Sequence, residues 1–192
     1  MNQYHCVFCS ICDSVPAYTP TPSSQAQYPP SFETHNIILS TSTYLAFLDF
    51  QPLVSSIYHV LLIPRRHVVR LSELVDLLEE RTQLGGILAL LSRALCECFD
   101  DVEDFNIVQN NGPAAGQIVP HAHFHVIARS SSLNTQEIQT IEPDNTQERL
   151  RFQLLIYGKG PRQDLDGDAA TKVCHRLRSY MYKHLPKVLS KL

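Results

Sequence analysis

Three histidines alternate along residues 121–125, and this spacing is the strongest chemical signal in the chain. His121, His123 and His125 are separated by Ala122 and Phe124. Side chains alternate between the two faces of a strand, so the imidazoles are predicted to share one face while the residues between them enter the core. Such a face can bind a metal ion, or one imidazole can attack phosphorus while its neighbours assist. A surface cluster without chemistry is the alternative.

A glycine-containing loop comes shortly before these histidines. It reads Asn110-Asn111-Gly112-Pro113-Ala114-Ala115-Gly116-Gln117. The two glycines let the backbone approach a ligand closely. Exposed N–H groups, together with the side chains of Asn110 and Gln117, can hold phosphate oxygens. The loop alone is weak evidence, but joined to the alternating histidines it predicts a phosphate-handling site.

Cysteines near the start of the chain give a second signal. Cys6 and Cys9 have metal-like spacing, although a single Cys-x-x-Cys pair is only half of a zinc site. Free buried thiols and a disulfide are the alternatives. We see no secretory segment and no apolar run long enough for a membrane span, so we expect a soluble protein of the cytoplasm or nucleus with reduced thiols.

The patterns between these motifs predict the elements that carry them. Apolar and β-branched runs favour strands at residues 35–39, 44–50, 57–63, 105–109 and 121–128. Leucines at steps of three and four favour a long helix over residues 71–99. A second helix is expected over residues 166–184, beginning near Asp166 or Asp168.

The ends of this core differ in composition from the rest. Residues 14–32 contain five prolines and no charge, which predicts an extended inserted loop. We expect one domain over residues 1–130 and a C-terminal extension, residues 131–192, packed on it. From residue 129 onward the net charge is +4, against −7 before it. This extension is expected to hold a strand at residues 152–157.

The chain's overall charge of −3 gives no reason to expect nucleic acid or a membrane as partner.

These motifs, in this order, resemble the histidine triad (HIT) family of nucleotide hydrolases and transferases. Two further segments carry the likeness: Phe47-Leu48-Asp49-Phe50-Gln51-Pro52 and His59-Val60-Leu61-Leu62-Ile63-Pro64-Arg65-Arg66-His67. The resemblance covers residues 4–129 once the proline-rich insertion is skipped. It implies an α+β fold, a HIT-like five-stranded antiparallel sheet with a long helix on one face, to which this chain adds a C-terminal helical extension. It also implies a homodimer formed through the long helix and a strand.

The resemblance assigns roles residue by residue. His123 matches the nucleophile, which attacks the α-phosphorus of a nucleotide and forms a nucleotidyl-histidine that water then hydrolyses to release AMP. His125 would contact the α-phosphate, and His59 would support the triad. The implied nucleotide-binding residues hold the ribose, the base and the phosphates, and they are Asp49, Phe50, Asn110, Gly116, Gln117 and Ile118. Ile118 departs from the family, because relatives commonly carry Ser or Thr there, and a missing hydroxyl can weaken activity or change the leaving group.

The implied substrates are purine nucleotides with an AMP moiety, and no organic cofactor is expected. The loop looks closest to the dinucleoside polyphosphate hydrolases, whereas the Cys-x-x-Cys start looks like the phosphoramidase branch. In that branch a structural Zn²⁺ is common, and its ligands would match Cys6, Cys9, His67 and His121. Cys12 and His5 are substitute ligands.

Three other functions are kept open. Ile118 and the basic extension motivate a nucleotide-binding regulator with low turnover. A nucleic-acid adenylate hydrolase, as in the aprataxin branch, has thin support because the extension lacks a zinc-finger pattern and interleaved aromatic residues. The third alternative is a metal enzyme whose metal ion is held by the three alternating histidines. Lys159 and Arg162, beside two glycines, either reach a phosphate or lie in a solvated turn.

Overall fold

The computed structural model describes residues 6–18, 28–54, 56, 58–76, 78–130, 146–147, 150 and 158–191. The strand expected at residues 152–157 and the substitute ligand His5 lie outside these ranges. Within them, every helix is too short or too polar to cross a bilayer.

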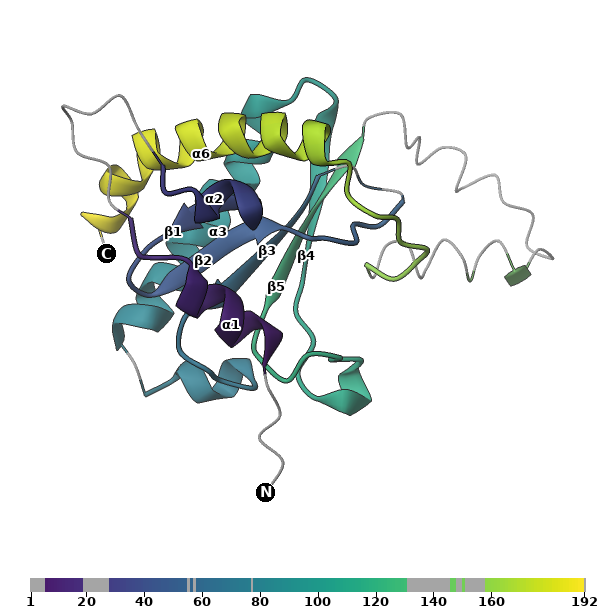
Figure 1. Cartoon of the computed structure of the whole chain (residues 1–192). Coiled ribbons are helices and arrows are strands. Elements are labelled where there is room, and N and C mark those ends of the chain that lie inside the picture. Colours follow the sequence, from purple (N-terminus) through teal and green to yellow (C-terminus); the bar gives the residue numbers. More distant parts are fainter. Residues whose placement is uncertain are drawn as a thin grey trace.

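Five strands form one antiparallel sheet in the order β1-β2-β3-β5-β4 (Figure 1). They are β1 (Ile37–Ser40), β2 (Tyr44–Leu48), β3 (His59–Pro64), β4 (Val102–Val108) and β5 (Phe124–Ser130). Every residue of β1, β2 and β3 is buried, because other elements cover these strands on both faces. The predicted α+β fold with a five-stranded antiparallel sheet is confirmed, with strand ends shifted by a few residues.

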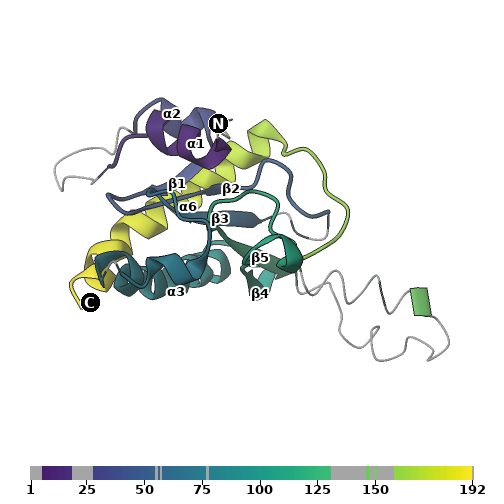
Figure 2. The same ribbon diagram turned by 90° about the horizontal axis from the view of Figure 1, so that it is seen from below.

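The sheet separates two layers of helices. Figure 2 shows α1 (Val7–Ser14) and α2 (Ser31–Thr34) on one side of the sheet and α3 (Leu78–Cys98) on the other. Phe47, Leu61 and His125 are register partners across β2, β3 and β5, so their side chains share one face. Phe47 contacts Phe8 of α1 at 5.9 Å between ring centroids. The histidine face is therefore the α1 side, and α3 lies behind it.

The predicted helix over residues 71–99 is wrong at its start. A separate 3-10 turn, η1 (Leu71–Leu74), precedes α3. Leu74 packs with Val68 and Ala122 in a small second core, and the Glu73 carboxylate accepts a hydrogen bond from the Val69 N–H at 3.0 Å. These tertiary contacts hold η1 against the segment that follows β3. The long helix α3 therefore begins only at Leu78.

The C-terminal helix, α6 (Gly167–Leu189), packs on α3 and on the edge strand β1. The side chain of Asp166 accepts hydrogen bonds at its N-terminus, as predicted. Nε and Nη2 of Arg178 donate to the Ile37 carbonyl at 3.0 and 2.7 Å, and the Ser40 N–H donates to the Tyr182 hydroxyl at 3.1 Å. The helix thus satisfies polar groups that an exposed edge strand would otherwise leave unpaired.

Residues 158–166, which we call the strap, lead into α6 and run along the segment that follows β2. Backbone hydrogen bonds run from Val54 N to Pro161 O at 3.0 Å, from Gln163 N to Pro52 O at 3.1 Å, and from Leu165 N to Phe50 O at 3.2 Å. A bridge pairs Leu53 with Arg162. The strap is therefore fixed beside the residues that leave β2, where Asp49 and Phe50 lie.

Candidate active site and metal centre

The histidine segment does not form one continuous strand, because the chain still bends at residues 119–121 and β5 begins only after His123. The rings of His121 and His123 both contact Phe8, at centroid distances of 5.7 and 5.3 Å. His123 in turn lies 5.0 Å from His125. All three imidazoles lie on the α1 side of the sheet, but His121 joins a different cluster from the other two.

One hydrogen bond fixes the tautomer of His123. Its Nδ1 lies 2.6 Å from the carbonyl oxygen of His121, and a carbonyl can only accept, so Nδ1 carries the proton. The lone pair of the neutral ring is therefore on Nε2. His123 is buried, and this burial lowers its pKa, so the ring is neutral at pH 7. A neutral imidazole with its lone pair held on one nitrogen can attack phosphorus without first losing a proton.

Asp49, His59 and His125 form a chain of side chains beside this ring. Nε2 of His59 lies 2.9 Å from Nδ1 of His125. The other nitrogen of His59, Nδ1, lies 3.6 Å from Oδ2 of Asp49, which is too long for a hydrogen bond. In the described part of the chain, this Nδ1 is the buried side-chain atom that lacks a hydrogen-bond partner. A proton there would face the carboxylate, and Nε2 would then accept from the Nδ1–H of His125.

Burial keeps the two imidazoles of this cluster uncharged. It lowers the pKa of His59 to about 4 against the opposing effect of Asp49. It lowers the pKa of His125 to about 2, and the neighbouring His59 and His123 add to the effect. A bound phosphate would favour the protonated imidazole through its negative charge. Both rings are therefore neutral at pH 7, and an anionic ligand would favour their protonation.

The loop before the histidines is held by its own glutamine. Oε1 of Gln117 accepts from the Gly112 N–H at 2.6 Å, and Nε2 donates to the carbonyls of Val69 and Val119 at 2.8 and 3.0 Å. Buried polar groups must be paired, and here the loop's own backbone provides the partners of this side chain. Gln117 thus shapes the loop, and its expected contact with a phosphate stays a prediction.

The other predicted nucleotide residues surround the same face. Asp49 and Phe50 directly follow β2, and Phe50 is 41% exposed. Asn110 follows β4, whose residue Val108 is the register partner of His125. Gly116 has a φ of +81°, a conformation that favours glycine. Asp49 and Phe50 border the histidine cluster, since Asp49 lies 3.6 Å from His59 and Phe50 packs on Phe47, whereas the contacts of Asn110 and Gly116 with a nucleotide stay a prediction.

Ile118 lies directly after this loop. Its side chain is 92% exposed. The residue that departs from the family pattern therefore faces solvent. A polar residue at this position would cost no packing in the core.

The four predicted metal ligands converge. The Sγ atoms of Cys6 and Cys9 and one ring nitrogen each of His67 and His121 lie within 4.8 Å of one another. The sulfur-to-Nδ1 distances are 3.5 Å for Cys6–His121, 3.2 Å for Cys9–His67 and 3.6 Å for Cys9–His121. A tetrahedral Zn²⁺, with Zn–S of about 2.3 Å and Zn–N of about 2.0 Å, places S and N about 3.5 Å apart. The donor set and its spacing therefore fit zinc.

A hydrogen bond to the backbone orients one of these ligands, His121. Nε2 of His121 lies 2.8 Å from the carbonyl oxygen of Pro64, so Nε2 carries the proton and the Nδ1 lone pair faces the cysteines. Because His121 is directed here, the three histidines do not converge as a three-histidine metal centre would require. Cys12 is buried in the main core and does not belong to the group of four.

Two contacts at the site were not anticipated. Phe8 of α1 packs on His121 and His123. Arg162 of the strap donates through Nη1 to Oδ2 of Asp49 at 2.7 Å and to the Gln51 carbonyl at 2.5 Å. The sequence suggested a phosphate ligand or a solvated turn for Arg162. Asp49 is 113 positions away, so no local pattern could have indicated this ion pair.

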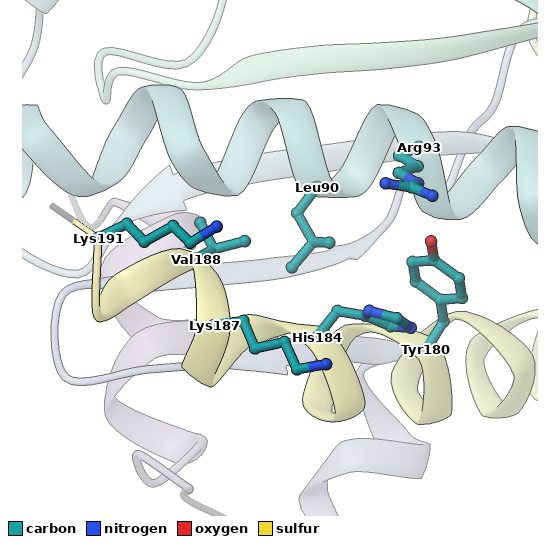
Figure 3. Close-up of a pocket in the computed structure, with 7 residues that line it drawn as sticks. All are labelled: Leu90, Arg93, Tyr180, His184, Lys187, Val188 and Lys191. Carbon is teal, nitrogen blue, oxygen red and sulfur yellow. The ribbon is translucent and has the colours of Figure 1, made fainter.

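A basic groove lies elsewhere, between α3 and α6. Figure 3 shows Arg93, His184, Lys187 and Lys191 around it. Arg93 also forms an exposed ion pair with Glu97 of the same helix, at 3.1 Å. Since α3 covers the face of the sheet opposite the histidines, this groove is separate from the candidate active site.

Comparisons with known proteins identify relatives of this chain. A model of the HIT domain matches residues 32–132. The chain is 35% identical over 92 residues to the adenosine 5'-monophosphoramidase hnt1 of Schizosaccharomyces pombe. The aligned segment covers 48% of this chain and 62% of that protein. It is 31% identical over 109 residues to the bifunctional bis(5'-adenosyl)-triphosphatase/adenylylsulfatase FHIT of Arabidopsis thaliana, covering 57% of this chain and 58% of that protein.

A solved structure shares the fold. The Zn-bound histidine triad family protein from Mycobacterium smegmatis superposes with a TM-score of 0.56 at 24% identity, covering 95% of this chain and 96% of that one. The chain spans about three fifths of the length of the two curated relatives. The HIT-domain match covers more than half of the chain, and this chain therefore belongs to the HIT domain family.

Proposed function

We propose that this protein is a hydrolase that cleaves nucleotides at the α-phosphate and releases AMP, with His123 as its nucleophile. The observation that carries the proposal is the hydrogen bond from Nδ1–H of His123 to the His121 carbonyl, which leaves the lone pair on Nε2. The relatives in Schizosaccharomyces pombe and Arabidopsis thaliana are named as an adenosine phosphoramidase and a bis(5'-adenosyl)-triphosphatase. Their two kinds of substrate are accordingly the candidates.

The reaction would proceed in two displacements. Nε2 of His123 forms a bond to the α-phosphorus, and the bond from phosphorus to the leaving group breaks with its electron pair on that group. Water then attacks the same phosphorus, the phosphorus–nitrogen bond breaks, and AMP leaves while His123 regains its neutral ring. His125, whose Nδ1 is hydrogen-bonded to His59, would take up a proton on Nε2 when the phosphate binds. This N–H would donate to the α-phosphate oxygens and stabilise the charge that develops on them.

Recognition of the nucleoside falls to the residues that follow β2. The Asp49 carboxylate can accept two ribose hydroxyls, and the half-exposed ring of Phe50 can contact the base. Asn110 and the backbone at Gly116 would lie at the phosphates. Ribose would share Asp49 with Arg162, which holds that carboxylate in this structure.

Direct tests are AMP release and capture of the intermediate. The protein is incubated with adenosine 5'-phosphoramidate and with diadenosine triphosphate, and AMP is followed by chromatography. Brief exposure followed by alkaline quench should add one adenylyl mass to the intact protein, and acid should remove it because the histidine phosphoramidate bond is acid-labile. The His123→Ala protein should form neither AMP nor adduct. AMP release by that variant at the unmodified rate would refute the proposal.

A nucleotide-binding regulator with low turnover is the second candidate. Two observations favour it: Ile118 presents no hydroxyl to a leaving group, and Arg162 occupies Asp49. Tight AMP binding by calorimetry, without a trappable adenylyl-protein, would support this candidate over the first.

We further propose that Cys6, Cys9, His67 and His121 hold one structural Zn²⁺. The support is the converging donor set and the Pro64 contact that orients His121. Zinc would tie α1 to the loop after β3 and to the segment before β5. With four protein ligands the coordination sphere would be closed, so we assign the metal no part in the chemistry.

We also propose a homodimer through α3 and β4. An apolar groove between them is lined by Leu88, Ala89, Cys96, Phe105 and Ile107. Phe105 and Ile107 are 42% and 45% exposed, and β4 is an edge strand of the sheet. A second copy that pairs its β4 with this edge would cover both the apolar groove and the unpaired backbone groups.

A further inference from the structure

The strap lies directly on the histidine face of the sheet. A Cβ atom on Gly158 would meet Ile127 Cδ1 at 2.9 Å and Val108 Cγ2 at 3.2 Å. Ile127 is the register partner of His59, and Val108 is the register partner of His125. Gly158 also has a φ of +68°. The strap therefore begins in close contact with the strands that carry the catalytic cluster, and this approach requires glycine.

The other part of the strap is anchored at the nucleoside end of the site. Arg162 pairs with Asp49 and with the carbonyl of Gln51. The backbone hydrogen bonds to the segment after β2 add to this anchor. One end of the strap therefore lies against Ile127 and the other on Asp49, which places the residues between these two points beside the histidines.

Between these anchors, Lys159 reaches the loop that precedes the histidines. A Cβ on Gly116 would meet Lys159 Nζ at 3.6 Å and Cε at 3.8 Å. At the far end of the same loop, Gly112 is approached by Arg70 instead. The strap thus delivers an ammonium group to the part of the loop that the proposed function places at the phosphates.

We propose that Lys159 is a specificity-determining residue, whose ammonium group binds the anionic leaving group and makes dinucleoside polyphosphates better substrates than phosphoramidates. The inference rests on the proposed function. When His123 displaces a nucleoside diphosphate, the bond from the α-phosphorus to the bridging oxygen breaks, and the electron pair adds negative charge to that oxygen. An ammonium group stabilises this charge as it develops. Ammonia, the leaving group of adenosine 5'-phosphoramidate, carries no phosphate for Lys159 to bind.

The test compares both substrates on the full-length protein. For Lys159→Ala, we expect kcat/KM for diadenosine triphosphate to fall about tenfold, the effect of losing one charge-assisted hydrogen bond. The value for adenosine 5'-phosphoramidate should stay within about twofold, since Lys159 does not touch that leaving group. Lys159→Arg should retain most of the preference. Lys172→Ala removes an exposed lysine of α6 and serves as the matched control.

Each outcome has a distinct meaning. A fall in the ratio of the two kcat/KM values, restored by arginine, supports the inference. Equal losses of kcat/KM on both substrates would show that Lys159 only holds the strap in place, and unchanged kcat/KM values for both would show that its charge is not used. Either result overturns the inference while leaving the proposed function standing. Absence of AMP release from both substrates by the unmodified protein would instead refute the proposed function.

Discussion

Acid should destabilise this protein through its buried histidines. In the folded protein the pKa of His59 is about 4 and that of His125 about 2, mainly because burial disfavours the charged ring. In the unfolded chain both return to about 6.5. Between these values the unfolded state binds more protons than the folded state, so stability is fully present above pH 6.5 and is lost as the pH falls toward the folded pKa.

The size of the effect follows from the pKa difference. Each imidazole that is neutral when folded and charged when unfolded lowers the free energy of unfolding by about 1.4 kcal/mol per pH unit. From pH 7.5 to pH 5, one such ring therefore accounts for about 2 kcal/mol, and His59 with His125 for about 4 kcal/mol. This is a large part of the stability of a typical domain.

Urea denaturation at pH 7.5 and pH 5.0 measures this loss. The matched variant is His125→Asn, because the asparagine amide can occupy the position of the ring's Nδ1, which contacts His59 at 2.9 Å, and cannot titrate. The drop in unfolding free energy between the two pH values should be about 2 kcal/mol smaller in this variant. Carboxylates and the cysteine–histidine cluster are common to both proteins, so their contributions cancel in the comparison.

Parallel pH dependence of the two proteins would refute the reasoning. It would mean that His125 takes up a proton in the folded state as easily as in the unfolded chain, and the neutral cluster inferred for the active site would then be wrong. A steeper dependence in the variant would also contradict it.

Three further predictions concern other parts of the fold. Cys9→Ser should lose bound zinc by elemental analysis and lower the thermal midpoint by at least about 3 °C, whereas Cys96→Ser should do neither; equal zinc in both would contradict the site. Phe105→Lys should convert a dimer into a monomer by light scattering with an unchanged circular dichroism spectrum, and a retained dimer would place the interface elsewhere. Arg178→Met leaves the Ile37 carbonyl and Glu33 without their partner, so urea denaturation should show a loss of about 3 kcal/mol; a loss below about 1 kcal/mol would show that α6 is held by apolar packing alone.

Local patterns in the sequence determined the chemistry and the order of elements. Apolar alternation located β2 and β3 to within two residues, and the His-x-His-x-His spacing together with the glycine loop identified the candidate site. These features depend on neighbouring residues, whose side-chain directions follow from strand and helix geometry. The likeness to the HIT family supplied the metal ligands, which lie in three separate segments.

Tertiary structure decided the contacts that join distant segments. Alternation could not show that β5 begins after His123, because that depends on where the chain bends against other elements. It could not show that Gln117 turns inward to pair with the backbone, or that Arg162 meets Asp49 across 113 positions. Such contacts form only once packing brings the strap, the loop and the sheet together, and the sequence holds no local periodicity that would indicate them. The motifs therefore determined which residues can react, and the packing decided which charges surround them.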